Sequence, residues 1–326
     1  MHSRIRRAAC LLAAGLLWTQ MAAAAQTGDW PTQTIRIIVP SPPGGAYDAT
    51  IRPVARSLSQ TLQQPVVIEN KASGGNIIGT QAGARAAPDG YTLTMTGMVN
   101  TISAGIYDNL TFDINEDFTH IGSIGAGPQW LVVRADAGIG SLQALIEQAR
   151  QSPGKINYAS SGVGSTAHLL MESLQRTAGI SLTHVPYKGG APALQDVLGG
   201  VVPAIVVPPN TAIPYVKQGT LKVLAISSAE RDPALPDVPT FKELNYPQLT
   251  VSAWVGLSAP KGTPIEIVNK INAAIATAMQ DPELKSQLIA LGMVPMTMSP
   301  AQYAELVRSD TERWGQLTHS LNIKAN

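Results

Sequence analysis

The stretch IRIIVPSPPGGAYD, which begins at Ile35, constrains the fold more than any other part of the chain. Its apolar run predicts a buried parallel strand from Thr34 to Pro40, and the amphipathic residues after it predict a helix from Gly45 to Thr61. The prolines stiffen the loop in between, and Gly44 and Gly45 have no side chain to keep a guest away. The first N–H groups of such a helix have no intrahelical partner and carry partial positive charge, so the loop is expected to bind an anion. The aspartate that ends the stretch is expected to cap the turn, because a carboxylate repels an anionic guest.

Strands and helices alternate along the rest of the chain, which is typical of an open α/β sheet. The other expected strands are Pro65–Glu69, Tyr91–Thr96, Ile121–Arg134, Ile156–Ala159, Thr183–Pro186, Ala204–Val207, Leu221–Ser227 and Ser252–Ala259. The other expected helices are Ile77–Ala87, Ser141–Gln151, Ser165–Thr177, a short helix in YKGGAPALQDVLGG, Ala212–Gln218, Pro264–Gln280 and Pro300–Leu321. Ligands of such sheets bind beyond the carboxyl ends of the strands, where Ser41–Tyr47 and Gly97–Asn100 are expected to lie.

Two segments indicate that the chain passes between two domains. It leaves the first domain near Arg134 and returns near Val251, and the loop SSGVGS repeats the strand, small-residue loop and helix of the opening stretch. We therefore expect an α/β protein in which residues 26–133 and 252–326 form domain 1 and residues 134–251 form domain 2. Each domain is expected to hold a mostly parallel sheet flanked by helices. The two crossing strands would act as a hinge, with a cleft for a guest between the domains.

The N-terminus has the pattern of a secretory signal peptide. Three arginines precede an apolar run, and small residues follow it up to Ala25. We expect residues 1–25 to be removed on export to the periplasm. Cleavage also removes Cys10, the only cysteine, and a chain without cysteine suits an oxidising compartment.

Composition argues against several classes of function. Charged residues make up 14% of the 326 residues, the formal net charge is +1, and the sequence has no basic stripe, so nucleic acid is not expected as a partner. No second apolar run reaches the roughly 18 residues that a transmembrane helix needs. The histidines show no metal-ligand spacing, so neither a metal site nor another cofactor is expected.

Several stretches carry a family pattern: IRIIVPSPPGGAYD, VVIENKASGGNIIGT, PDGYTL, NYASSGVGSTAHLLMESL, HVPYKGGAPALQDVLGG, LKVLAISSAERDPALPDVPTFKE and GLSAPKGTP. In this order they resemble the periplasmic solute-binding proteins of tripartite tricarboxylate transporters, including the Bug group of beta-proteobacteria. The resemblance implies a two-domain Venus-flytrap fold of the periplasmic-binding-protein type II-like class. It also implies a monomeric receptor, not an enzyme, that captures a small carboxylate and delivers it to membrane permease subunits.

In that family, both domains hold one ligand carboxylate, largely through main-chain N–H groups and ordered water. Carried over to this sequence, the contacts in the first-domain loop are Ser41, Gly44, Gly45, Ala46 and Tyr47. The contacts in the second-domain loop are Ser160, Ser161, Gly162, Gly164, Ser165 and Thr166. The remaining wall, which is expected to select the ligand, consists of Met98, Val99, Asn100, Trp130, Tyr187 and Asn210.

The sequence departs from the usual family pattern at three places. Tyr47 stands where many relatives have a small residue, and Ser41 replaces a common aromatic residue. Pro203 and the pair Pro209-Asn210 occupy a region that is often built around an aspartate. An amino-acid ligand then has no partner for its ammonium group. We therefore hypothesise an organic acid without an amine, such as an aromatic acid or a dicarboxylate.

Two other functions stay open at this point. Ser161, Ser165 and His168 suggest a serine hydrolase, but Ser165 as a helix N-cap beside a hydrogen-bonded His168 explains the same spacing, and no third orienting group is evident. His184, at the end of a strand, is expected to be structural. The chain could also be an orphan receptor that reports its ligand to a sensor protein and serves no permease.

Overall fold

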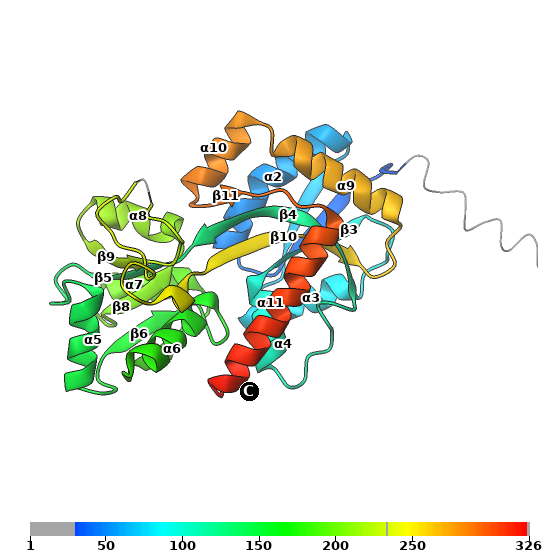
Figure 1. The fold of residues 1–326 in the computed structure, drawn as a ribbon. Coiled ribbons are helices and arrows are strands. Elements are labelled where there is room, and N and C mark those ends of the chain that lie inside the picture. The colour runs from blue at the N-terminus through cyan, green and yellow to red at the C-terminus, as the bar shows by residue number, and fades with distance from the viewer. Residues whose placement is uncertain (1–29, 233, 325–326) are drawn as a thin grey trace, which may run out of the picture.

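The computed structural model describes residues 30–232 and 234–324, which form two lobes with one β-sheet each (Figure 1). The second lobe is an insertion between two segments that cross from one sheet to the other. The signal peptide expected at residues 1–25 lies outside the described residues.

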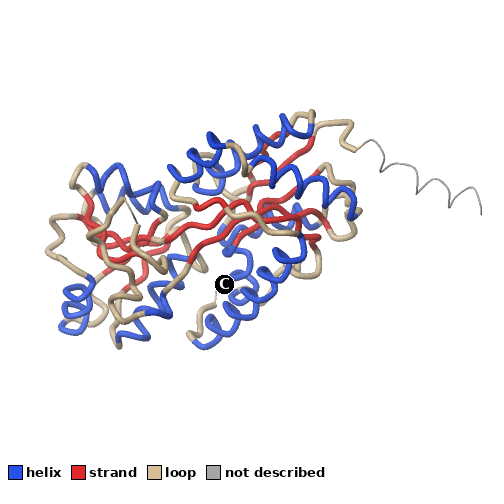
Figure 2. The backbone as a smooth tube through the Cα atoms, turned by 45° about the horizontal axis from the view of Figure 1, so that its top comes forward, coloured by secondary structure: helices blue, strands red, loops and turns tan. Residues whose placement is uncertain are grey.

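The sheet of the first lobe has the strand order β11-β4-β10-β3-β1-β2. Its strands are β1 (Ile35–Val39), β2 (Val66–Asn70), β3 (Thr92–Gly97), β4 (Phe118–Pro128), β10 (Ser252–Pro260) and β11 (Val294–Pro295). Its helices are α2 (Ala46–Leu62), η1 (Gly74–Asn76), α3 (Ile77–Ala84), α4 (Met98–Ile106), α9 (Ile265–Ala278), α10 (Pro282–Ala290) and α11 (Pro300–Ser320). Helices lie on both sides of these strands (Figure 2).

The sheet of the second lobe has the strand order β7-β6-β8-β5-β9. Its strands are β5 (Trp130–Arg134), β6 (Asn157–Ser160), β7 (Thr183–Pro186), β8 (Ala204–Val207) and β9 (Leu221–Ile226). Its helices are α5 (Leu142–Gln151), α6 (Thr166–Ala178), α7 (Gly190–Leu198), α8 (Pro209–Lys217) and η2 (Pro247–Leu249). None of the helices in the described ranges is long and apolar enough to cross a bilayer.

Each sheet is mixed, whereas the sequence predicts mostly parallel strands. β1 pairs in parallel with β2 and β3, and β6 pairs in parallel with β7 and β8. By contrast, β10 and β5 run antiparallel to both of their neighbours. The reason is topological, because β10 and β5 carry the chain from a crossing into a lobe, while the strands beside them run in the opposite direction, toward the side of the crossings.

The first crossing lies at Gln129 and not after residue 133, as the sequence predicts. β4 ends at Pro128 in one sheet, and β5 begins at Trp130 in the other. The chain returns to the first sheet after Val251. Apolar residues flank Gln129 on both sides, so hydrophobic periodicity alone does not mark where the sheet changes.

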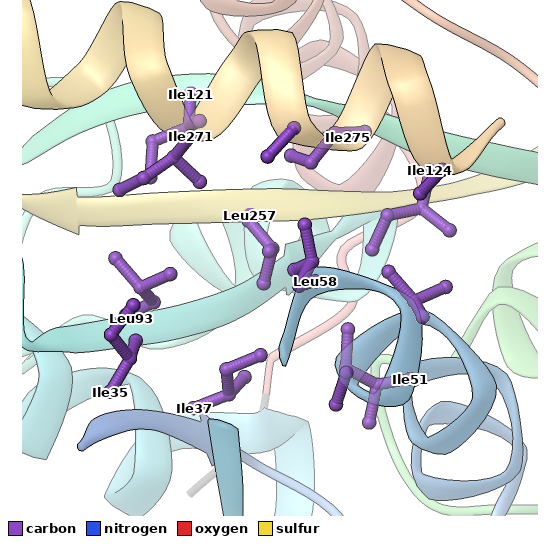
Figure 3. Packing of buried hydrophobic residues seen from close by; sticks show 14 of the residues in the cluster. Ile35, Ile37, Ile51, Leu58, Leu93, Ile121, Ile124, Leu257, Ile271 and Ile275 are labelled. Atoms are coloured by element: carbon purple, nitrogen blue, oxygen red, sulfur yellow. The ribbon is translucent and has the colours of Figure 1, made fainter. Parts of the chain in front are cut away.

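The core of the first lobe explains the apolar residues of the opening stretch. Ile35 and Ile37 of β1 are buried in one cluster with Ile51 and Leu58 of α2 (Figure 3). Ile271 of α9 joins the same cluster, so α2 and α9 cover one face of the sheet together. This packing fixes the direction in which the loop after β1 leaves the sheet.

Ser227 joins the two crossings, and its side chain is fully buried. Its hydroxyl accepts a hydrogen bond from the Gln129 N–H at 2.8 Å and donates one to the Val251 carbonyl at 2.5 Å. Its main chain bonds the same two residues. The Ser227 N–H donates to the Gln129 carbonyl at 2.9 Å, and the Ser227 carbonyl accepts from the Val251 N–H at 2.8 Å. The two strands that link the lobes are therefore tied together through one serine.

We predict that Ser227→Ala destabilises the protein by about 1–3 kcal/mol, because the Gln129 N–H loses its acceptor in a buried place. Ser228→Ala is the matched control, since the neighbouring Ser228 hydroxyl bonds to the carbonyl of exposed Glu230. Urea denaturation of both variants measures the difference. Equal stabilities would show that the Ser227 hydroxyl does not hold the crossings together.

Candidate functional site

Strand register places the small-residue loops of both lobes on the sides that face each other. In the first lobe, Gly97 at the end of β3 pairs with Val255, close to where β10 begins, and β1 runs parallel to β3. In the second lobe, Val207 at the end of β8 pairs with Trp130, the first residue of β5, and β6 runs parallel to β8. The loops after β1, β3, β6 and β8 therefore all leave their sheets next to the crossings.

The lobes touch beside these loops. Gly164, in the loop after β6, has a positive φ of 76° and lies so close to Ile106 of α4 that a Cβ would collide with it. Gly292, after α10, has a φ of 73° and packs in the same way against Pro209 at the start of α8. A third buried cluster also includes Leu169 of α6 among residues of the first lobe. The described conformation is one in which the two lobes are in contact.

The loop between β1 and α2 is closed on itself by Asp48. The buried Asp48 carboxylate accepts hydrogen bonds from the Gly44 N–H at 2.8 Å, from Asn70 Nδ2 at 2.9 Å and from the Arg52 guanidinium at 2.7 and 2.8 Å. Burial by itself raises the pKa of Asp48, but the bonds from Arg52, Gly44 and Asn70 outweigh it and hold the pKa below its usual range. The expectation that this aspartate caps the turn is confirmed.

The amides of Gly44 and Gly45 are therefore occupied, which corrects their expected role as donors to a guest. The Gly44 N–H bonds to Asp48, and the Gly45 N–H donates to the Pro42 carbonyl at 3.1 Å. The first intrahelical bond of α2 runs from Ala49 N to the Gly45 carbonyl, so the N–H groups that precede Ala49 have no acceptor within the helix. The donors that this loop offers are thus the N–H groups of the first turn of α2, including those of Ala46 and Tyr47.

The Tyr47 hydroxyl faces the first lobe and not a guest. It lies where a Cβ of Gly97 would be, close to the Val99 backbone and the Asn76 side chain. Burial raises the pKa of Tyr47 strongly, although these two polar neighbours oppose the shift. Tyr47 as a whole is half-buried, so the first lobe encloses its side chain only in part.

The loop between β6 and α6 is also closed on itself. The Gly162 N–H donates to Ser160 Oγ at 3.1 Å, and the Gly164 N–H donates to Nδ1 of His168 at 3.2 Å. Ser165 caps α6, with its Oγ accepting from the His168 N–H at 3.3 Å. The two glycines are again not free donors, and the first turn of α6, which begins at Thr166, supplies the N–H groups without an intrahelical acceptor.

Sequence reasoning missed the histidine stack beneath this loop. The rings of His168 and His184 are stacked with centroids 4.0 Å apart, and Tyr158 stacks on the other side of His184 at 4.9 Å. His184 Nε2 lies 2.6 Å from Ser160 Oγ. Burial lowers the pKa of both histidines to about 4, and the charge of a protonated His168 would lower the pKa of His184 further. No short motif predicts this contact, because the two histidines lie on different elements.

Three of the expected wall residues are structural, which corrects their assignment. Trp130 is fully buried in the core of the second lobe, and Met98 is buried in the cluster between the lobes. Asn100 is buried as a cap of α4, with Oδ1 accepting from the Gly97 N–H at 2.8 Å and Nδ2 donating to Thr80 Oγ1 at 2.7 Å. α4 itself was not expected from the sequence.

The other wall residues are more accessible. Val99, Tyr187 and Asn210 are half-buried, and Tyr187 follows the strand next to β6. The Tyr187 hydroxyl donates to Asp196 Oδ2 at 2.6 Å, and this bond raises the pKa of Tyr187 to about 12. Asn210 lies in the first turn of α8, next to the Pro209 that touches the other lobe.

Two serines of the loops keep unused hydroxyls. Ser41 Oγ is buried and has no hydrogen-bond partner within residues 30–232 and 234–324. Ser161 is exposed at the tip of its loop. With the first-turn N–H groups of α2 and α6, they form a set of hydrogen-bond donors to which both lobes contribute. Such a set suits a small anion with several oxygen atoms.

The serine and histidine geometry does not fit a nucleophile with its general base. Ser165 Oγ bonds a main-chain N–H of His168, while the ring of His168 bonds Gly164. Beside this loop, the serine that meets a histidine ring is Ser160, whose side chain is fully buried and also bonds Gly162. A nucleophile must be reachable by substrate.

The largest remaining questions for this region are whether it holds a cavity and whether it could bind a metal ion. A cavity of about 540 Å³ lies between α6 and α11, and of the expected site residues only Thr166 lines it. In the part of the chain that the structure describes, no cluster of three or more His, Cys, Asp or Glu residues is arranged to hold a metal ion.

We predict that the free energy of unfolding decreases as the pH falls from about 6.5 to about 4. Burial lowers the pKa of His120, His168 and His184 to about 4 in the folded protein, whereas an unfolded histidine titrates near 6.5. In this window the unfolded chain binds protons that the folded chain excludes, so acid favours unfolding, and above the window the contribution is fully present. Urea denaturation at stepped pH tests this, and a stability that is constant or rises toward pH 4 contradicts it.

Known proteins with the same arrangement identify the family. The chain matches the tripartite tricarboxylate transporter family receptor over residues 50–323. BugT of Bordetella pertussis is 35% identical over 306 residues, which cover 93% of this chain and 94% of BugT. The structure of MatC from Rhodopseudomonas palustris with bound malate superposes with a TM-score of 0.82 at 31% identity, covering 88% of this chain and 99% of MatC. The structure of another R. palustris protein, with adipate, superposes with a TM-score of 0.86 at 31% identity, covering 91% of this chain and 99% of that protein. This chain therefore belongs to the family of tripartite tricarboxylate transporter receptors, a group of two-lobed periplasmic solute-binding proteins.

Proposed function

We propose that this chain is a periplasmic receptor that binds a small carboxylate between its lobes and delivers it to the permease of a tripartite tricarboxylate transporter. The observation that carries the proposal is the pair of helix N-termini, α2 in one lobe and α6 in the other. Both follow strands that end at the side facing the other lobe. The periplasmic location agrees with the signal peptide expected at residues 1–25. We further propose that the receptor acts as a monomer.

Binding would use charge-assisted hydrogen bonds from both lobes. One carboxylate would accept hydrogen bonds from N–H groups in the first turns of α2 and α6 and from the Ser41 hydroxyl. Each hydrogen bond to a charged group contributes about 1.5–3 kcal/mol, so a few of them support micromolar affinity after the cost of ordering the lobes. Because neither lobe holds all the donors, the ligand would favour the conformation in which the lobes are in contact.

The ligand class follows from the charges around the loops. The acidic side chains beside the two loops are already bound, Asp48 by Arg52 and Asp196 by Tyr187. A ligand ammonium group would then compete with these partners, which disfavours amino acids. The malate and adipate in the related structures are carboxylates without an amine. We therefore propose an organic acid, with the half-buried Val99, Tyr187 and Asn210 facing its remainder.

We predict that malate, adipate or an aromatic acid such as benzoate raises the melting temperature, whereas glutamate and aspartate do not. A ligand at 100 times its dissociation constant adds about 2.7 kcal/mol of stability, which thermal-shift assays resolve. Isothermal titration calorimetry then measures the affinity of the acid that shifts most. Tight binding of glutamate or aspartate without binding of any organic acid would contradict the proposed ligand class.

We predict that Ala46→Pro weakens carboxylate binding about tenfold to a hundredfold while α2 stays folded. Proline at the first helical position removes one N–H but suits the local backbone, since Gly45 before it is extended with φ −70° and ψ 169°. Removing one charge-assisted bond costs about 1.5–3 kcal/mol. Thr166→Pro makes the same change at the start of α6, where Ser165 is also extended.

Two controls accompany these variants. Ile265→Pro places proline at the start of α9, where Ile265 is exposed, and should leave the affinity unchanged. Thr166→Val keeps the N–H and the shape of the side chain. If Ala46→Pro and Thr166→Pro both bind the acid as well as Ile265→Pro does, the helix N-termini are not the carboxylate site.

A further inference from the structure

The two stacked histidines of the second lobe each hold one glycine N–H of the same loop. His168 holds Gly164 directly, through Nδ1 at 3.2 Å. His184 holds Gly162 through Ser160, since Ser160 Oγ lies 2.6 Å from His184 Nε2 and accepts the Gly162 N–H at 3.1 Å. The ring centroids are 4.0 Å apart and the planes differ by 13°, so the pair acts as one packed unit.

The Ser160 hydroxyl links His184 to the loop. Ser160 Oγ accepts from the Gly162 N–H at 3.1 Å, and it lies 3.1 Å from the Gly162 carbonyl and 2.6 Å from His184 Nε2. A hydroxyl has one proton, so either Ser160 donates to His184 Nε2, or His184 Nε2 carries the proton and donates to Ser160 while Ser160 donates to the Gly162 carbonyl. In both arrangements the neutral ring of His184 holds Ser160 Oγ where it accepts from Gly162.

The hydrogen bond from Gly164 assigns the tautomer of His168. Its Nδ1 accepts from Gly164 and so carries no proton, which leaves the proton on Nε2. Nε2 lies 3.8 Å from Glu172 Oε1, an oxygen that already accepts bonds from the Tyr158 hydroxyl and from Gln175, each at 2.7 Å. A second proton on His168 would place a donor against the Gly164 N–H and break the contact.

We propose that His168 and His184 are positioning residues of the carboxylate site: as neutral rings they fix Gly164 and Gly162, and they thereby set the loop that leads into the donor N–H groups of α6. The identity of the ligand in this inference rests on the proposed function, whereas the role of the histidines in the loop geometry is independent of it. The histidines do not touch the ligand. They act because a glycine can adopt many backbone conformations, and the side-chain bonds select the positive φ angles of 130° at Gly162 and 76° at Gly164.

The binding test compares variants that keep or lose one hydrogen-bonding atom, with adipate as the probe. His168→Leu loses the acceptor for Gly164 and should weaken adipate binding at least tenfold at pH 7. His168→Asn can place Oδ1 where Nδ1 was and should recover most of that loss. In the same way, His184→Leu should weaken binding, and His184→Gln, whose Nε2 can donate to Ser160, should recover it.

A matched control separates positioning from general destabilisation. Leu145→Ala opens the core of the same lobe on α5, where Leu145 is fully buried, and lowers stability without touching the loop. If it weakens adipate binding as much as His168→Leu does, or if Asn and Gln recover nothing, the histidines only support the fold and the inference is wrong.

Amide hydrogen exchange by NMR tests the loop without any ligand. In His168→Leu the Gly164 amide should exchange at least tenfold faster than in the wild type, while in Ser160→Ala the Gly162 amide should accelerate and Gly164 should not. If both amides exchange at wild-type rates, the histidine contacts do not hold the loop, and the inference fails whatever adipate does. If the amides respond as expected but adipate does not bind the wild type, the positioning of the loop stands and the proposed adipate ligand fails.

Discussion

The need of buried main-chain N–H groups for acceptors governs the region between the lobes. Turns rich in glycine expose their amides, yet here these amides are bound within their own lobe. Asp48 accepts the Gly44 N–H, His168 accepts that of Gly164, and Ser160 accepts that of Gly162. What each loop leaves open is the first turn of the helix that follows, where the helix geometry itself provides no acceptor. The glycines thus shape the loops, and the helix N-termini would bind the carboxylate.

The lobes that carry these N-termini are linked at the crossings and touch at two other places. The crossings are tied by Ser227, whose four hydrogen bonds keep the two linking strands in register. Away from the crossings, the lobes meet through close contacts at Gly164 and Gly292. A ligand held by donors from both lobes would add to these contacts, so ligand binding and lobe closure are expected to favour each other.

Much of the fold could be predicted from the sequence. The bounds of β7 and β8 are confirmed, because short runs with β-branched residues between turn signals specify strands. The direction of β5 and β10 was not predictable, since it depends on which lobe each strand enters. α4 was missed because its cap, Asn100, reads as the polar end of a strand until its bonds to Gly97 and Thr80 are seen.

The candidate site was predictable as a pair of loops but not atom by atom. The two helices begin at Ala46 and Thr166, one residue after the expected Gly45 and Ser165. The sequence gives no sign that Trp130 is a core residue and not part of a cleft wall. The partners of the glycine amides cannot be predicted from the sequence because they depend on side-chain direction, and His184 reaches its loop from another strand.

The most direct test of the proposed site is a ¹H–¹⁵N NMR titration with malate or adipate. We expect the amides of Ala46, Tyr47, Thr166 and Ala167 to shift on binding, while those of Gly44 and Gly162 keep their slow exchange. Loss of protection at these two glycines, with no shift in the helix N-termini, would contradict it.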